Sequence, residues 1–99
     1  MTEPSSDDHA TVRRTVIYTG RVQGVGFRYT TCDVAADYDV TGYVKNLRDG
    51  RVELVAEGRS EEVDRFLDGV ADALGGYVRD TQITASPATG QFNQFDVAY

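Results

Sequence analysis

The order in which strand-like and helix-like patterns follow one another is the feature that most limits the fold of this chain. Alternating apolar residues predict strands at 12–22, 40–46 and 51–57, and apolar residues at helical spacing predict a helix at 28–38. The remaining elements are a second helix between its N-cap Ser60 and the stop signal Gly75, a fourth strand within 77–86, and a short closing strand with Phe95, Val97 and Tyr99 on one face. The predicted order is therefore strand, helix, strand, strand, helix, strand, with a short last strand.

This order is that of the split βαβ, or ferredoxin-like, fold. We expect an α+β sandwich with a four- to five-stranded, mostly antiparallel sheet and two helices on one face. Right-handed crossovers place the third strand between the first two, and the first strand between the third and fourth. The first two strands then run parallel, so the segment after Val22 and the residues around Asn46 should emerge at the same end of the sheet. The last strand should bring the Tyr99 carboxylate to that end as well.

The length of the chain, 99 residues, is that of one domain with a single core. Residues 1–11 are polar and acidic and predict a disordered tail, which leaves 12–99 as the domain. His9, the only histidine, lies in that tail, so catalysis or metal binding by histidine is not expected. Cys32 is the only cysteine, which rules out an internal disulfide; its position favours a packed helix residue over a nucleophile.

The charge balance is acidic, with a net charge of −6 from eleven Asp and five Glu against nine Arg and the single Lys45. Such a balance argues against nucleic acid and anionic membranes as partners. The sequence contains no apolar run of membrane-spanning length and no secretory leader, so a cytoplasmic protein is expected. Many acids and almost no lysine are also typical of proteins from a salt-rich cytoplasm, and we hold a halophilic origin as a hypothesis.

The glycine-containing segment at 20–28 follows the first predicted strand and opens the first helix. Gly24 and Gly26 can adopt positive φ, which lets successive backbone N–H groups converge on one anion. The N-terminus of the helix would point its unpaired N–H groups at the same place. Arg28 lies in the first helical turn, where a cation opposes the helix dipole, and this favours an anion nearby. The alternative is a plain connector with a solvated arginine.

Two segments resemble the signatures of the acylphosphatases, small enzymes that hydrolyse the carboxyl–phosphate bond of acyl phosphates. They are Gly20-Arg21-Val22-Gln23-Gly24-Val25-Gly26-Phe27-Arg28 and Gly42-Tyr43-Val44-Lys45-Asn46, the second followed by Gly50 and Val52. The C-terminal segment at 89–99 is also similar to the family, so the resemblance covers nearly everything after Val12. Three departures are Tyr18 for an aliphatic residue, Tyr43 for the commoner Trp, and Asp39 for a Gly at a helix end. At Asp39 a left-handed conformation would carry a modest stability cost.

The resemblance implies an acylphosphatase that uses no metal, no cofactor and no covalent intermediate. Arg28 and Asn46 would be catalytic, with Arg28 binding phosphate and the Asn46 amide orienting the attacking water. The phosphate-binding residues would be Gln23, Gly24, Val25, Gly26, Phe27 and Arg28, through backbone N–H groups and the guanidinium. These few groups suffice for catalysis because an acyl phosphate has a good leaving group and phosphoryl transfer needs mainly positioning and charge neutralisation. The implied partners are a small acyl phosphate and inorganic phosphate, and a monomer is expected.

Several alternatives remain open from the sequence. Asn46 could be a turn-forming residue before Asp49-Gly50, and the Tyr99 carboxylate could ion-pair with Arg28. A phosphate-sensing or partner-binding ferredoxin-like module would keep the loop but show little turnover. RNA binding is a less favoured alternative, because the chain is acidic and lacks an aromatic-and-basic motif on its central strands. Acylphosphatase-like modules also occur within larger proteins that use carbamoyl phosphate, but this chain shows no appended domain.

Overall fold

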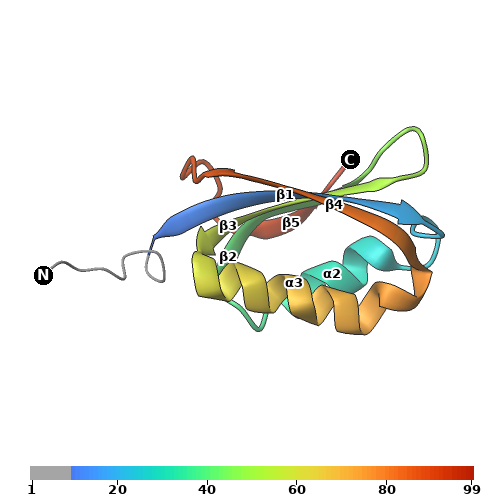
Figure 1. The fold of residues 1–99 in the computed structure, drawn as a ribbon, viewed down its shortest axis with the longest axis horizontal. Coiled ribbons are helices and arrows are strands. Elements are labelled where there is room, and N and C mark those ends of the chain that lie inside the picture. Colours follow the sequence, from blue (N-terminus) through green and yellow to red (C-terminus); the bar gives the residue numbers. More distant parts are fainter. Residues whose placement is uncertain (1–9) are drawn as a thin grey trace, which may run out of the picture.

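Five strands form one sheet, and both helices cover the same face of it (Figure 1). The computed structural model describes residues 10–99. The elements are β1 (Thr11–Gly20), α2 (Phe27–Ala35), β2 (Val40–Asn46), β3 (Val52–Arg59), α3 (Ser60–Leu74), the 3₁₀ helix η1 (Gly75–Tyr77), β4 (Val78–Pro87) and β5 (Phe95–Ala98). The strand order is β4-β1-β3-β2-β5, in which only β2 and β5 pair in parallel. The predicted α+β, ferredoxin-like fold and its strand order are confirmed.

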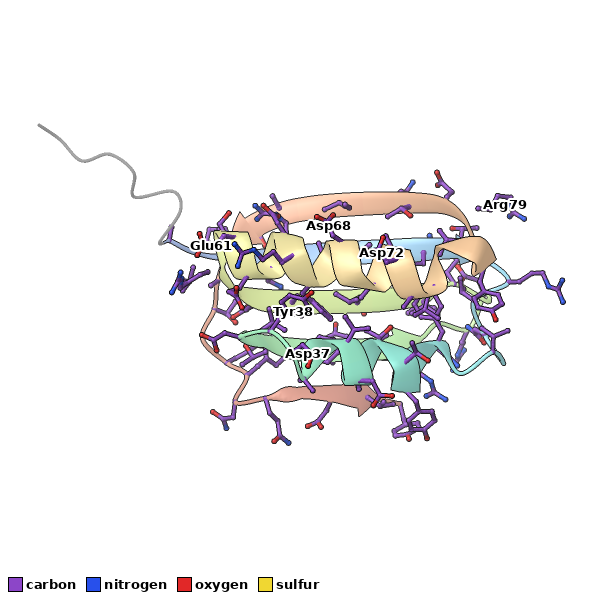
Figure 2. The ribbon with its side chains drawn as sticks, turned by 90° about the horizontal axis from the view of Figure 1, so that it is seen from below. Asp37, Tyr38, Glu61, Asp68, Asp72 and Arg79 are labelled. Carbon is purple, nitrogen blue, oxygen red and sulfur yellow. The ribbon has the colours of Figure 1, made fainter. Side chains whose placement is uncertain are left out.

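The core lies between the sheet and the two helices, which run side by side beneath it (Figure 2). Alternate residues of the three central strands point into it: Val16 and Tyr18 from β1, Val44 from β2, and Val52, Leu54 and Ala56 from β3. The helices contribute Phe27, Thr31 and Ala35 from α2 and Val63, Phe66, Val70 and Leu74 from α3. Tyr38 follows α2 and packs its ring 6.3 Å from that of Phe66. The apolar stripes expected from the sequence therefore face a common core.

One glycine allows β2 to lie against β3. Gly42 has a φ of +139°, and a Cβ at this position would overlap the carbonyl oxygen of Val55. A side chain would push the strands apart at the centre of the sheet. Because Asn46 ends β2, the close pairing of these strands also fixes where Asn46 emerges.

The ends of β1 and α2 differ from the prediction. β1 ends at Gly20, before the predicted end at Val22, because its pairing with β4 shifts register between Thr19 and Gly20. Val22 is nevertheless fully buried. α2 ends at Ala35 instead of continuing to 38, because the N–H groups of Asp37 and Tyr38 bond three residues back, to the carbonyls of Val34 and Ala35.

Three further expectations about element ends are also wrong. β3 continues through Gly58 to Arg59, since Gly58 pairs with both Val12 and Val40. α3 begins at Ser60 itself, and Arg59 occupies the N-cap position without a side-chain cap hydrogen bond. Asp39 does not adopt positive φ, and its N–H donates to Glu62 Oε1 at 2.9 Å, so the expected strain is absent.

The predicted tail at 1–11 falls largely outside the described residues, as does His9. Thr11 already belongs to β1, where it pairs with Arg59, so the ordered domain begins before the predicted residue 12. The longest helix in the described part of the chain is α3, with 15 residues, and none is long and apolar enough to cross a bilayer.

Candidate active site

The glycine-containing segment, the start of α2 and the end of β2 surround one cavity of about 280 Å³. Its lining residues are Val22, Gly24, Gly26, Phe27, Arg28, Tyr29 and Asn46. The structure thus brings together the two residues that the resemblance marks as catalytic, Arg28 and Asn46. They come from different elements that emerge at the same end of the sheet, as the predicted topology requires.

The backbone of this segment presents N–H groups to the cavity. Gly24 and Gly26 have φ values of +81° and +77°, and Gly26 is the N-cap of α2 without a side-chain cap hydrogen bond. Across residues 10–99, no acceptor pairs with the N–H groups at positions 23–29, and the first turn of α2 carries no acidic residue. Unpaired N–H groups at a helix N-terminus attract anions through their partial charges. The cavity is therefore suited to a phosphate group.

The Arg28 side chain adds a full positive charge to this wall of the cavity. Among the described residues its guanidinium makes no ion pair, and its central carbon lies 5.1 Å from the centre of the Tyr99 ring. This is a cation–π distance. The ion pair between the Tyr99 carboxylate and Arg28, which the sequence left open, is not found among residues 10–99; the guanidinium contacts the Tyr99 ring instead. The guanidinium keeps its N–H donors for a ligand.

Asn46, the last residue of β2, contributes a buried and unsatisfied polar atom. Its Oδ1 has no hydrogen-bond partner in the part of the chain that the structure describes. An unpaired buried acceptor costs about 1–3 kcal/mol, so such groups are uncommon outside functional sites. The turn that follows is closed by other groups: the N–H of Gly50 donates to Leu47 O, and the N–H of Leu47 donates to Arg51 O. The Asn46 side chain takes no part in that turn.

Two of the six predicted phosphate-binding residues do not line the cavity. Gln23 directs its side chain to the β2–β3 turn, where Nε2 donates to Leu47 O at 2.8 Å and to Arg51 O at 2.9 Å. Val25 packs against the core. Gly24, Gly26, Phe27 and Arg28 do line the cavity. Gln23 thus ties the glycine segment to the turn beyond Asn46, a role that the sequence does not reveal.

Tyr29 and the Tyr99 ring are the site residues that sequence reasoning missed. Tyr29 lines the cavity, and its hydroxyl lies 3.4 Å from that of Tyr99. The sequence contained one indication of a role for Tyr29. This aromatic residue follows Arg28 in the first helical turn but lies outside the apolar stripe that begins at Phe27. For Tyr99 the topology predicted the location but not the contact.

A larger cavity of about 600 Å³ lies at the opposite end of the sheet, near Glu57 and Thr89. Its buried carboxylate, Glu57, already accepts hydrogen bonds from Thr89 and Gly90, so this carboxylate is occupied within the protein. Residues 10–99 hold no group of three or more His, Cys, Asp or Glu suited to a metal ion. Burial raises the pKa of the Cys32 thiol, and Asp96 and Asp33 raise it further, which disfavours the reactive thiolate.

Comparison with known proteins points to one family. A family model for acylphosphatase matches residues 14–97. An acylphosphatase of Paenarthrobacter aurescens is 42% identical over 88 residues, which cover 88% of this chain and 94% of that protein. One of Listeria monocytogenes is 41% identical over 83 residues, 82% of this chain and 89% of that protein. The crystal structure of acylphosphatase from Bacillus subtilis superposes with a TM-score of 0.81 at 36% identity, over 89% of this chain and 99% of that one.

Proposed function

This chain is an enzyme of the acylphosphatase family, which hydrolyses acyl phosphates, and we propose that it does so by direct attack of a water molecule that Asn46 orients. The observation that carries the proposal is the meeting of Arg28, unpaired N–H groups and the unpaired Asn46 Oδ1 on one cavity. The substrate would be a small acyl phosphate, and the products a carboxylate and inorganic phosphate.

Arg28 and the backbone of the glycine segment would bind the phosphate group. The Arg28 guanidinium and the N–H groups of Gly24, Gly26, Phe27 and Arg28 would hold the non-bridging phosphoryl oxygens, where negative charge must be neutralised as the reaction proceeds. A guanidinium suits this role because it is planar, permanently charged and able to donate two hydrogen bonds at once. Gln23 would hold the glycine segment in position through its hydrogen bonds to the β2–β3 turn.

Asn46 would orient the water on the side of phosphorus opposite the leaving carboxylate. The water oxygen forms a bond to phosphorus while the bond from phosphorus to the acyl oxygen breaks. The electron pair of the broken bond leaves with the carboxylate. A carboxamide can both accept from and donate to water without titrating at neutral pH. Because the buried Oδ1 has no hydrogen-bond partner within residues 10–99, it can accept a hydrogen bond from that water.

The test is hydrolysis of benzoyl phosphate by the wild type, Arg28→Ala and Asn46→Ala. Each substitution should lower kcat/KM by about 10²–10³-fold, because each removes a group that acts on the transition state. Matched controls are Arg48→Ala and Asn93→Ala, two exposed residues that do not line the cavity. Both controls should retain wild-type rates, and all four variants should unfold near the wild-type midpoint.

The outcomes also separate the enzyme from the phosphate-sensing module considered above. Equal turnover by the wild type, Arg28→Ala and Asn46→Ala would refute the site assignment. A wild type that binds inorganic phosphate but does not hydrolyse benzoyl phosphate would refute the proposed hydrolysis and favour the sensor.

A further inference from the structure

Two exposed tyrosines stand together at the mouth of the candidate active site. The side chains of Tyr29 and Tyr99 are 61% and 84% exposed. The other exposed large apolar residues, Tyr77 and Ile83, do not line this cavity. Leaving two aromatic rings in water at one place forgoes the stabilisation that their burial would give, which favours a binding role.

The two rings are held relative to each other and to the phosphate site. Tyr29 lies in the first turn of α2 and Tyr99 follows β5, and their hydroxyls approach to 3.4 Å. The Tyr99 ring also lies against the Arg28 guanidinium, 5.1 Å from its central carbon. The pair is thus an ordered aromatic surface directly beside the group that would bind phosphate.

The cavity has room for the phosphoryl group and for part of a small acyl group. Its volume of about 280 Å³ lies just below the range of roughly 300–1,000 Å³ for pockets that enclose a drug-sized ligand. Among its lining residues, the two glycines, Arg28 and Asn46 suit phosphate and water. The acyl part of a substrate whose phosphate is bound by these residues faces the rest of the lining, where Tyr29 is the exposed aromatic residue.

We propose that Tyr29, with Tyr99 beside it, forms a subsite for the acyl part of the substrate and favours aromatic and large apolar acyl groups over acetyl. The inference rests on the proposed hydrolysis of acyl phosphates. An aromatic acyl group can stack on a phenol ring or meet its edge, which adds to the burial of apolar surface. The hydrogen bond with Tyr29 raises the pKa of the Tyr99 hydroxyl, so this hydroxyl adds no negative charge beside the phosphate site at neutral pH.

The experiment compares kcat/KM for benzoyl phosphate and acetyl phosphate in the wild type, Tyr29→Ala, Tyr29→Phe and Tyr77→Ala. In Tyr29→Ala the benzoyl-to-acetyl ratio should fall by about 3- to 10-fold, mainly through a higher KM for benzoyl phosphate. Tyr29→Phe keeps the ring and should keep the ratio. Tyr77→Ala removes an exposed tyrosine that does not line the cavity and should also keep it.

Competitive inhibition by inorganic phosphate is measured in parallel and should be unchanged in Tyr29→Ala. An unchanged ratio, or an equal loss with both substrates, would refute the subsite while leaving the proposed hydrolysis intact. A ratio that falls as far in Tyr29→Phe would also refute it, because the hydroxyl would then act through Tyr99 and Arg28. Failure of the wild type to hydrolyse either substrate would refute the proposed function itself.

Discussion

The Gln23 side chain joins the two segments that carry the candidate active site. Its amide nitrogen donates to the carbonyls of Leu47 and Arg51, which lie in the turn after Asn46. Each neutral hydrogen bond contributes about 0.5–1.5 kcal/mol to stability. We predict that Gln23→Met, which keeps the length of the side chain but not its donors, lowers the free energy of unfolding by about 1–3 kcal/mol. It should also lower kcat by about 10- to 100-fold, because a small displacement of Asn46 misplaces the water.

Urea unfolding and steady-state hydrolysis of benzoyl phosphate measure the two effects of Gln23→Met. Gln82→Met is the matched control, since Gln82 is exposed on β4 and makes no side-chain hydrogen bond among the described residues. It should resemble the wild type in both assays. Gln23→Met with full activity and lowered stability would contradict the claim that this side chain positions Asn46.

The connection between β4 and β5 is anchored at the element scale by the buried carboxylate Glu57 of β3. Glu57 is 4% exposed and accepts hydrogen bonds from the Thr89 N–H and hydroxyl and from the Gly90 N–H, at 2.8–3.1 Å. Arg13 Nη1 lies 3.4 Å from it. Burial alone would raise the pKa of Glu57, but the bonds from Thr89 and Gly90 and the charge of Arg13 outweigh it, so the pKa is lowered.

A lowered pKa in the folded state means that Glu57 stabilises the protein fully above its ordinary pKa, and that this contribution is lost as pH falls through the folded-state value. We predict that Glu57→Gln lowers the free energy of unfolding at pH 7 by about 1–3 kcal/mol. It should also flatten the loss of stability that the wild type shows on acidification. Urea unfolding between neutral pH and pH about 3 measures both effects.

Glu61→Gln is the control, because its ion pair with Arg59 is largely exposed and such pairs contribute little. A Glu57→Gln variant as stable as the wild type at neutral pH would disprove the anchoring role. Equal slopes with pH in both proteins would disprove the assignment of the acid sensitivity to Glu57.

Element types were predictable from sequence, whereas element ends and the finer parts of the site were not. Periodicity and crossover handedness are properties of the local chain, and they sufficed for the strand order and for the approach of Arg28 to Asn46. The continuation of β3 through Gly58 depends on pairing with the distant residues Val12 and Val40. The same is true of the Gln23 side chain, whose partners lie 24 and 28 residues away. The Tyr29–Tyr99 contact spans 70 residues, and no local pattern encodes it.

At the scale of the whole molecule, the net charge of −6 leaves some acidic residues without an ion pair among residues 10–99, and three of them lie along α3. Asp64, Asp68 and Asp72 are all exposed on α3 at intervals of four residues; Figure 2 labels the last two. Residues at this spacing are neighbours on a helix surface, and like charges there destabilise the helix by about 0.2–0.5 kcal/mol per pair. None of the three forms an ion pair within residues 10–99.

We predict that KCl raised from low concentration toward molar levels raises the midpoint of thermal unfolding, because screening at about 1 M shortens the range of these repulsions to about 3 Å. Asp68→Lys provides the internal check. At low salt it should increase the free energy of unfolding by about 0.5–1 kcal/mol, since two repulsive pairs become attractive while the pair with Arg65, three residues earlier, becomes repulsive; the gain should shrink at high salt. A midpoint that does not rise with KCl would refute adaptation of this surface to salt. A gain in Asp68→Lys that persists at molar KCl would mean that the substitution acts through helix propensity, not through charge.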